Sequence, residues 1–306
     1  MLYEGEESMN INLELYKVFY YVATTLSFSE ASKKLYISQS AVSQSIKALE
    51  GKLSQTLFIR STKKVRLTPE GEILLRHIEP AISLIRRGES QLLESITTGG
   101  QIRIAASDTI CRYFLVPYIE RFHQAFPNLH IKVINATSIR CVDILKNGQA
   151  DFIVVNYPNA YLNNLWSIKR IKQFRDVFVA NQSFSQLKDR KLSLAELSEY
   201  PLLMLDKQST TSEFLHSLFQ QHQLELVPEA ELSSNDLLID LARIGLGIAF
   251  VPDYCVPDDS DDLFIVETRE SLPQRELAVV YNDKLPVSPA VTEFLTYFNE
   301  LPDQKL

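Results

Sequence analysis

The stretch SFSEASKKLYISQSAVSQSIKALE, residues 27 to 50 of this 306-residue chain, decides how its amino-terminal part folds. Ser38 is a residue type that caps helix starts. The apolar residues after it recur at spacings of four, three and four, at Val42, Ile46, Leu49 and Leu53. This spacing places them on one face, so it predicts a helix with a buried stripe. Ser29 is another capping residue type. It predicts the start of a short helix that precedes the one capped by Ser38, with Leu35 facing inward.

The opposite face of the predicted helix is polar and nearly free of acids. It carries Ser40, Ser43, Gln44 and Lys47. Short hydroxyl and amide side chains reach the edges of DNA bases, and a lysine adds charge for phosphate. A helix face of this kind is usually just solvated when nothing else supports a role. The surrounding sequence decides in favour of DNA recognition.

The segments on either side complete a winged helix-turn-helix. Residues 12 to 26 carry apolar residues at helical spacing, namely Leu15, Phe19, Val22 and Leu26. The connection Tyr36–Ser38 suits a tight turn between two helices. Residues 58 to 67 alternate apolar and basic side chains around a turn, which predicts a β-hairpin. Its basic residues would lie along phosphates: Arg60, Lys63, Lys64 and Arg66.

A long helix is predicted to start at Pro69, because Thr68 is a capping residue and proline is favoured at the first helical position. Small and apolar residues then repeat at coiled-coil spacing: Leu74, Ile78, Ala81, Ile85, Gly88 and Leu92. Such a seam needs a partner helix, most simply that of a second copy. Residues 97 to 100 are expected to form the linker that ends it.

Charge is divided unevenly along the chain. Residues 10 to 66 hold nine basic side chains against three acidic ones, a net charge of +6; the whole chain is −7, so the remainder is −13. A basic module on an acidic domain indicates a polyanionic partner.

No apolar run approaches the ~20 residues of a membrane span. The start MLYEGEES, residues 1 to 8, resembles no secretory signal and is left out of the fold. We therefore expect a cytoplasmic protein with no membrane partner.

Beyond Gln101 the chain alternates short strands with helices. The first strands are QIRIAAS, HIKVIN and DFIVVN, and the second set is FRDVFVAN, PLLMLD and IAFVP. RELAVVYN and a helix over residues 291 to 299 close the chain. Alternation of this kind predicts mostly parallel sheets covered by helices. Two α/β lobes with a cleft between them are the expected result.

Hydroxyl and amide side chains follow the strands of this region repeatedly. Ligands of open α/β sheets bind at the carboxyl ends of strands, near helix N-termini that attract anions. The predicted effector-binding residues are Ser107, Thr109, Thr137, Ser138, Asn156, Ser209, Thr210 and Ser234. Each taken singly is better explained as a helix cap, but their convergence on one edge favours a pocket. Because no arginine cluster is evident, a small carboxylate or polar metabolite is favoured over a polyphosphate. Asp108 would either face away or pair with an amine on the ligand.

The chain resembles the LysR-type transcriptional regulators. Residues 15 to 71 do so through the block quoted above, followed by LFIR and VRLTPEG. LVPYIERFHQAFPNLHIKV, ILKNGQADFIVV and LARIGLGIAFVP resemble the effector-binding portion of that family. The resemblance implies an all-α winged helix-turn-helix DNA-binding domain at 9–68 and a long dimerising linker helix at 69–98. It also implies a two-lobed α/β regulatory domain at 101–306, similar to periplasmic solute-binding proteins.

The resemblance assigns roles to individual residues. Base-reading positions are matched by Gln39, Ser40, Ser43 and Gln44, and positions near the DNA backbone by Ser29, Lys47, Arg60 and Lys63. Ser40 stands where a proline is usual and Gln44 where an arginine is usual, so the preferred bases can differ from those of other members. Ser54 stands where glycine is common, which raises the cost of a left-handed helix end.

The resemblance also implies lobes, partners and assembly. The first lobe would take residues 101–165 and 270–306, and the second residues 166–269. Family members commonly assemble as tetramers, so a dimer of dimers on double-stranded DNA is expected, with RNA polymerase as a further partner. Closure of the lobes on the effector would re-angle the recognition helices.

An enzyme is the main alternative from another class. None of the motifs of serine hydrolases, phosphate loops, dinucleotide-binding folds or zinc proteases occurs, and the five histidines lack metal-ligand spacing. We expect no catalytic residue, metal or cofactor apart from the effector. A solute receptor is the third alternative; it would leave the basic module unexplained. The three cysteines, Cys111, Cys141 and Cys255, are expected to be core thiols, with a redox role the less favoured alternative.

Overall fold

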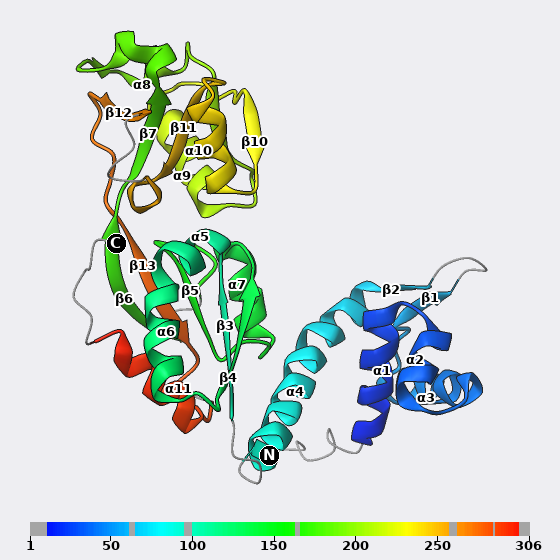
Figure 1. The fold of residues 1–306 in the computed structure, drawn as a ribbon. Coiled ribbons are helices and arrows are strands. Elements are labelled where there is room, and N and C mark those ends of the chain that lie inside the picture. The colour runs from blue at the N-terminus through cyan, green and yellow to red at the C-terminus, as the bar shows by residue number, and fades with distance from the viewer. Residues whose placement is uncertain are drawn as a thin grey trace, which may run out of the picture. The chain divides into compact units, whose positions relative to one another are not determined.

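The computed structural model describes residues 11–60, 65–94, 100–162, 166–256, 262–283 and 285–299. The chain forms two compact units, Met1–Ser90 and Gln91–Leu306 (Figure 1). The elements that begin in the first unit are α1 (Leu13–Thr25), α2 (Phe28–Leu35), α3 (Gln39–Leu53), β1 (Phe58–Arg60), β2 (Val65–Leu67) and α4 (Pro69–Glu94). The helical part and the hairpin confirm the predicted winged helix-turn-helix.

The first three helices enclose the core of the first unit. The stripe predicted for α3 is confirmed, because Val42, Ile46 and Leu49 are fully buried. Phe19 of α1 is buried against them and its ring lies 5.5 Å from that of Phe58, which joins the hairpin to the helices. The expectation for Leu26 was wrong: it is 47% exposed, because α1 ends at Thr25 and Leu26 forms a left-handed cap.

The start of α2 differs from the prediction. Ser27, not Ser29, is the N-cap, and its hydroxyl accepts the Glu30 N–H at 3.2 Å. Ser29 is the second residue of the helix and is exposed. The reason is packing: Phe28 is buried, with its ring 5.9 Å from that of Phe58, so the helix begins where this ring enters the core.

The hairpin and the long helix begin as the sequence predicts. β1 pairs antiparallel with β2, and residues 61–64, which include Lys63 and Lys64, lie outside the described residues. The Thr68 hydroxyl accepts the Gly71 N–H at 3.0 Å and caps α4. Gly71 lies so close to the hairpin that an added Cβ would be 2.3 Å from the Leu57 carbonyl oxygen. Ser54 does adopt the left-handed conformation, with φ of 50°.

Helix α4 runs unbroken through Pro80. The start of its seam, Leu74 and Ile78, packs on the core of the first unit. Further along, Ile85 is 51% and Leu92 71% exposed. Among the described residues, none of the helices combines the length and apolar character that a bilayer-spanning segment requires.

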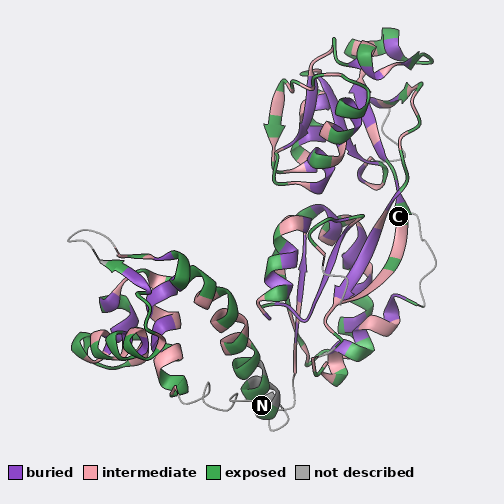
Figure 2. Ribbon diagram, turned by 180° about the vertical axis from the view of Figure 1, so that it is seen from behind, coloured by how far each residue is buried: buried purple, intermediate pink, exposed green. Residues whose placement is uncertain are grey.

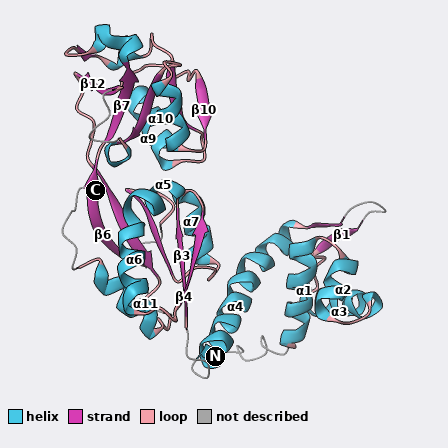
Figure 3. Cartoon of the chain, viewed as in Figure 1, coloured by secondary structure: helices cyan, strands magenta, loops and turns pink. Residues whose placement is uncertain are grey.

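The second unit contains two lobes, each built on one sheet (Figure 3). The first sheet has the order β4-β3-β5-β13-β6, from β3 (Gln101–Ala106), β4 (His130–Asn135), β5 (Phe152–Tyr157), β6 (Ser167–Phe174) and β13 (Arg275–Tyr281). The second has the order β10-β9-β11-β7-β12-β8, from β7 (Asp176–Asn181), β8 (Lys191–Leu192), β9 (Leu202–Leu205), β10 (Ala230–Leu232), β11 (Ile248–Pro252) and β12 (Leu263–Thr268).

Helices cover both sheets. The first lobe has α5 (Asp108–Ile110), η1 (Cys111–Leu115), α6 (Val116–Ala125), α7 (Ser138–Lys146) and α11 (Pro289–Tyr297). The second has η2 (Gln182–Leu187), α8 (Leu194–Leu197), α9 (Thr210–Gln221), α10 (Asn235–Arg243) and η3 (Asp253–Cys255). Strand β5 shows why a continuous apolar run marks a central strand: Phe152 packs toward α6 and α11, and Ile153 toward α7. Figure 2 shows buried residues concentrated in the central strands of each lobe.

The sheets are mixed: among the described strands of the two lobes, five pairings are parallel and four are antiparallel, so parallel pairing predominates only narrowly. β3 is parallel to β4 and β5, but β13 is antiparallel to β5 and β6, and β11 and β12 are antiparallel to β7. Strands β6 and β7 are joined through Arg175 alone and lie in different sheets, and each pairs antiparallel with strands that follow later in the chain.

The boundary between the lobes also differs from the expected one. Strand β6, residues 167–174, pairs with β13 and belongs to the first lobe, whereas residues from 166 onward were expected in the second. The chain therefore crosses between the lobes at Arg175, and it returns through residues 269–274.

Candidate functional site

The exposed face of α3 is the first candidate site. The Ser38 hydroxyl caps the helix by accepting the Ala41 N–H at 3.2 Å, and it lies 2.8 Å from the Ser40 hydroxyl. Gln39, Ser40, Gln44 and Lys47 are exposed, and Ser43 is half-buried. The neutral polar groups and Lys47 therefore project from the helix opposite its buried stripe.

The one acidic residue of α3 is turned away from this face. Glu50 accepts backbone N–H groups of Leu57 at 2.8 Å and Phe58 at 3.3 Å through one carboxylate oxygen. This contact removes a negative charge from the exposed face and fixes the start of the hairpin. The sequence shows the acid but not this role, because the partners are seven and eight residues away.

The remaining predicted DNA-contacting residues are less completely placed. Ser29 is exposed on α2, and its carbonyl accepts the Ser32 hydroxyl at 2.8 Å. Arg60 ends β1. Lys63 lies outside the described residues.

A cavity of about 390 Å³ between the lobes of the second unit is the second candidate site. All eight predicted effector-binding residues line it. They come from the N-terminal ends of α5, α7, α9 and α10 and from the end of β5. Asp108 and Ser233 also line it, together with residues that the prediction omitted: Asn135, Ala136, Leu205, Asp206, Thr211, Asn235, Pro252 and Tyr254.

The hydroxyls in the cavity act as helix caps and remain available as donors. Ser107 accepts the Ile110 N–H, Thr137 that of Arg140, Ser209 that of Thr211 and Ser234 that of Leu237, at 3.1 to 3.4 Å. The buried Ser138 hydroxyl likewise accepts the Asn156 N–H at 3.1 Å. A hydroxyl has one proton and two lone pairs, so an oxygen that accepts an N–H keeps its proton for another acceptor. The cap and the ligand-binding interpretations are therefore compatible.

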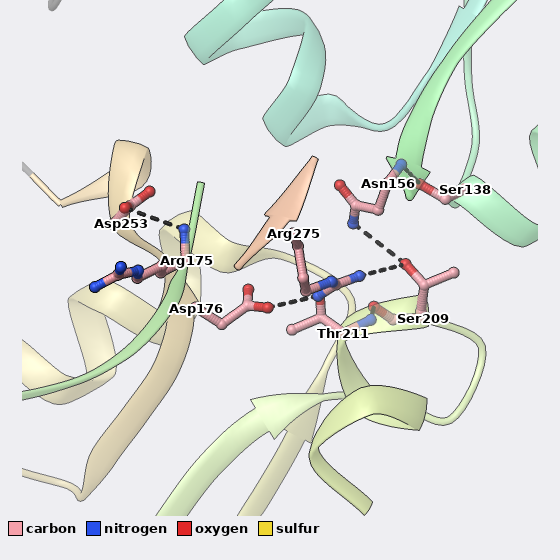
Figure 4. Close-up of polar contacts among 9 residues, drawn as sticks. Ser138, Asn156, Arg175, Asp176, Ser209, Thr211, Asp253 and Arg275 are labelled. Carbon is pink, nitrogen blue, oxygen red and sulfur yellow. Dashed lines mark hydrogen bonds and ion pairs between the residues drawn. The ribbon is translucent and has the colours of Figure 1, made fainter. Parts of the chain in front are cut away.

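Two hydrogen bonds of the same kind join the lobes across the cavity, and in each an asparagine of one lobe donates to a threonine of the other. Asn156, at the end of β5, donates to the Thr210 hydroxyl of α9 at 3.2 Å (Figure 4). Asn235, the first residue of α10, donates to the Thr109 hydroxyl of α5 at 2.9 Å. Asn235 could have been found from the sequence, because it holds the same position in its helix as Thr210 does in α9.

Two tyrosines form further contacts between the lobes. The Tyr113 hydroxyl donates to Asp236 at 2.5 Å, and the Tyr161 hydroxyl donates to Glu213 at 2.8 Å. Burial, followed by the bond to Asp236, raises the pKa of Tyr113. Both tyrosines are donors at neutral pH, and each joins the first lobe to the second.

The charge in the cavity comes from acids and helix ends. Asp108 and Asp206 line it, and its described lining includes no Lys, Arg or His. The Asn135 amide donates to Asp108 at 3.3 Å. The N-terminal ends of α7, α9 and α10 contribute partial positive charge. The cavity thus offers hydroxyl donors for an anionic group and carboxylates for a cationic or donor group.

The three cysteines lie in the second unit, and two of them are buried. Cys141 and Cys255 are buried and Cys111 is half-buried, as expected for two of the three. Burial, with Asp108 nearby, raises the pKa of Cys111 to about 11 and opposes thiolate chemistry. Within the described residues, no three His, Cys, Asp or Glu side chains gather as metal ligands would.

Two family models match the chain. Residues 13–72 match the bacterial regulatory helix-turn-helix protein of the lysR family, and residues 97–302 match the LysR substrate binding domain. The chain belongs to the LysR family. In this LysR-family protein, α3 lies in the DNA-binding part of a transcriptional regulator and the cavity lies in the effector-binding domain.

Known relatives match over nearly the full chain. The HTH-type transcriptional activator CmpR of Synechocystis sp. is 25% identical over 94% of this chain and 95% of its own length. A solved structure of full-length CbnR with its target DNA is 17% identical, covers 94% of this chain and 99% of that chain, and has a TM-score of 0.65. The CcmR regulatory domain of Synechocystis PCC6803, solved with 2-PG, is 19% identical, covers 65% and 95%, and has a TM-score of 0.60.

Proposed function

We propose that this regulator reads a DNA site as a dimer through α3 and that a small carboxylate or other small polar metabolite in the cavity sets its activity. The observation that supports the effector most directly is the gathering of hydroxyl and amide side chains from both lobes around one cavity. In a dimer, each α3 would enter one major-groove half-site of an inverted repeat.

The lining favours a particular kind of ligand. The CcmR complex with 2-PG indicates that a regulatory domain of this fold holds a ligand. In the present cavity the described lining has carboxylates at Asp108 and Asp206 and no cationic side chain. A phosphate dianion would face these acids without a counter-charge. We therefore favour a ligand with one carboxylate, bound by hydroxyls, and an amino or hydroxyl donor near the acids.

The same residues favour regulation over catalysis. Nucleophilic catalysis by Ser or Thr requires a base bonded to the hydroxyl. No described Ser or Thr of the lining is bonded to a histidine or lysine. A ligand held by such groups is bound rather than converted. A regulator of transcription works where DNA is, so the proposal places the protein in the cytoplasm.

The proposed assembly uses α4. Its seam is exposed at Ile85 and Leu92 and would pair with α4 of a second copy. A dimer of dimers would then let effector binding re-angle the recognition helices and alter contact with RNA polymerase. Sedimentation of the full chain with Ile85→Glu, compared with the native chain, tests this: loss of self-association is expected.

The DNA half of the proposal is tested with duplexes selected from a random pool. Gln44→Ala should relax preference at one base by ~1 to 3 kcal/mol, because an amide reads a base edge. Lys63→Ala should weaken binding to all duplexes and reduce the salt slope by about one unit. Lys17→Ala, on α1 and paired with Glu14 at 3.3 Å, is the matched charge control. Identical effects of Gln44→Ala on selected and random DNA would refute the assigned reading face.

The effector half is tested by thermal-shift screening of small carboxylates, amino acids and sugar phosphates. Ser107→Ala should abolish the shift that an active compound produces. Ser288→Ala is the matched control, because Ser288 caps α11 of the same unit by accepting the Val291 N–H at 3.3 Å but does not line the cavity. A shift that survives Ser107→Ala and disappears with Ser288→Ala would place the ligand elsewhere.

A further inference from the structure

A buried ion pair lies where the chain passes between the lobes. Asp176 is the first residue of β7 and Arg275 the first of β13, so each lies beside one of the two crossings. Their side chains are 0% and 3% exposed, and the Arg275 Nη1 lies 2.5 Å from Asp176 Oδ2 (Figure 4). Burial raises the pKa of Asp176, and the Arg275 guanidinium opposes that rise.

The same guanidinium extends to the start of α9. It donates to the Thr211 hydroxyl at 3.1 Å and to the Thr210 hydroxyl at 3.3 Å. Its centre lies 5.4 Å from the Phe174 ring and 5.2 Å from the Phe214 ring. A planar fork with several donors can make all these contacts, whereas a lysine offers one ammonium group. Arg275 thus connects both crossings to a helix end that lines the cavity.

Thr210, in the second lobe, accepts hydrogen bonds from two residues of the first lobe. Its hydroxyl oxygen accepts both the Arg275 Nη2 and the Asn156 amide, at 3.3 and 3.2 Å. Both lone pairs are then used, and the hydroxyl proton is left to donate. A ligand group that accepts this proton would strengthen the two bonds that Thr210 accepts, because hydrogen bonds in a chain polarise one another.

The second bond between the lobes provides a contrast inside the same cavity. Asn235 donates to the Thr109 hydroxyl at 2.9 Å, and among the described residues no cationic side chain bonds to Thr109. Three buried oxygens of the described residues lack a hydrogen-bond partner, and all three belong to these pairs or to the ion pair: Asn156 Oδ1, Asn235 Oδ1 and Asp176 Oδ1. Unpaired buried acceptors are costly, so this arrangement is poised to respond to a change at either end.

We propose that Arg275 is a positioning residue that transmits occupancy of the cavity, through Thr210, to the two crossings between the lobes. The proposal rests on the proposed function for its meaning, since the cavity must hold an effector. Asn156–Thr210 is then the coupled contact between the lobes, and Asn235–Thr109 only holds them together.

A double-mutant cycle on the full chain without ligand tests the connection. Asn156→Ala should lower the melting midpoint of the regulatory unit by about 2 to 4 °C in the native background and by less than half as much in Arg275→Lys, because the two residues share Thr210. Asn235→Ala, the matched control, should lower it equally in both backgrounds. Equal, additive effects of both asparagine substitutions would overturn the proposal.

A second measurement follows the crossing itself by hydrogen exchange. Arg175 and Asp253 bond each other there, the Arg175 N–H donating to Asp253 Oδ2 at 3.1 Å and the Asp253 N–H to the Arg175 carbonyl at 2.8 Å. Asn156→Ala should accelerate exchange of these amides at least threefold, and Asn235→Ala should not. A purely structural Arg275 would give no such distinction, so equal rates in both variants would also refute the proposal.

Two controls separate failure of this inference from other failures. Each variant should keep the far-ultraviolet circular dichroism of the native chain and melt cooperatively, which would show that its regulatory unit folds. The cycle needs no effector, so its outcome is independent of the screen: a screen without hits would refute the effector while leaving the coupling intact, and an additive cycle would refute the coupling alone.

Discussion

The α3 surface and the cavity present the same kinds of group, hydroxyls beside amides, in two different settings. On α3, Ser40 and Gln44 are exposed on one helix of one unit. In the cavity, Ser138 and Asn156 are 4% and 9% exposed, and side chains from two lobes surround the same space. The α3 surface is open and can bind a large partner such as a DNA groove, whereas the cavity can enclose only a small molecule.

The difference shows that local sequence sets the side-chain chemistry of a site, whereas tertiary packing sets the size of the partner it can bind. Helix caps supply the donors in both places: Ser38 caps α3 and Ser209 caps α9. Only convergence of several helix ends turns caps into a cavity. The two units should therefore respond separately to substitution.

The largest effect is expected in the core behind the α3 surface. Leu49→Ala removes a fully buried side chain and should destabilise the first unit by about 2 to 5 kcal/mol, with loss of DNA binding. Scanning calorimetry should show the melting of the regulatory unit unchanged. Leu13→Ala, at a position 69% exposed in the same unit, is the control and should have little effect. A parallel shift of both transitions would contradict the independence of the units.

A pair of glycine substitutions should separate the units at intermediate cost. Gly71→Ala places a Cβ 2.3 Å from the Leu57 carbonyl oxygen, and Gly247→Ala places one 2.4 Å from that of Pro201. Each should cost about 1 to 3 kcal/mol or more, the first in the DNA-binding unit and the second in the regulatory unit. Gly51→Ala meets nothing within 4 Å and should stabilise α3 by up to ~1 kcal/mol. Denaturant melts of both units check the assignment.

The smallest effect is expected at alkaline pH. All three cysteines lie in the regulatory unit, and burial raises the pKa of Cys111 to about 11 and of Cys141 to about 12. Because the folded thiols hold their protons longer than unfolded ones, their contribution is complete below about pH 9 and is lost as the pH rises toward 11.

Between pH 8 and 10.5 the melting midpoint of the regulatory unit should therefore fall more steeply than that of the first unit. Cys141→Ala should reduce that fall, while leaving the first unit as it was. Tyr254 has a pKa raised by burial and adds a fall of the same sign, so part should remain. An unchanged slope in Cys141→Ala would contradict the assignment.

Much of the first unit could be predicted because its signals are local. The stripe of Val42, Ile46 and Leu49 and the Thr68 cap depend on residues within one or two helical turns. The misplaced start of α2 was decided by Phe28, whose burial against Phe58 joins positions thirty residues apart. Competing caps of similar propensity, Ser27 and Ser29, cannot be separated without that contact.

The sequence by itself determined which residue types follow each strand and cap each helix, because caps and strand ends are written in neighbouring residues. Tertiary structure alone decided that β6 joins the first sheet, that Asn156 meets Thr210, and that Arg275 lies between Asp176 and α9. Those partners are 54 to 114 residues apart in the sequence, and their pairing depends on packing that no local pattern records.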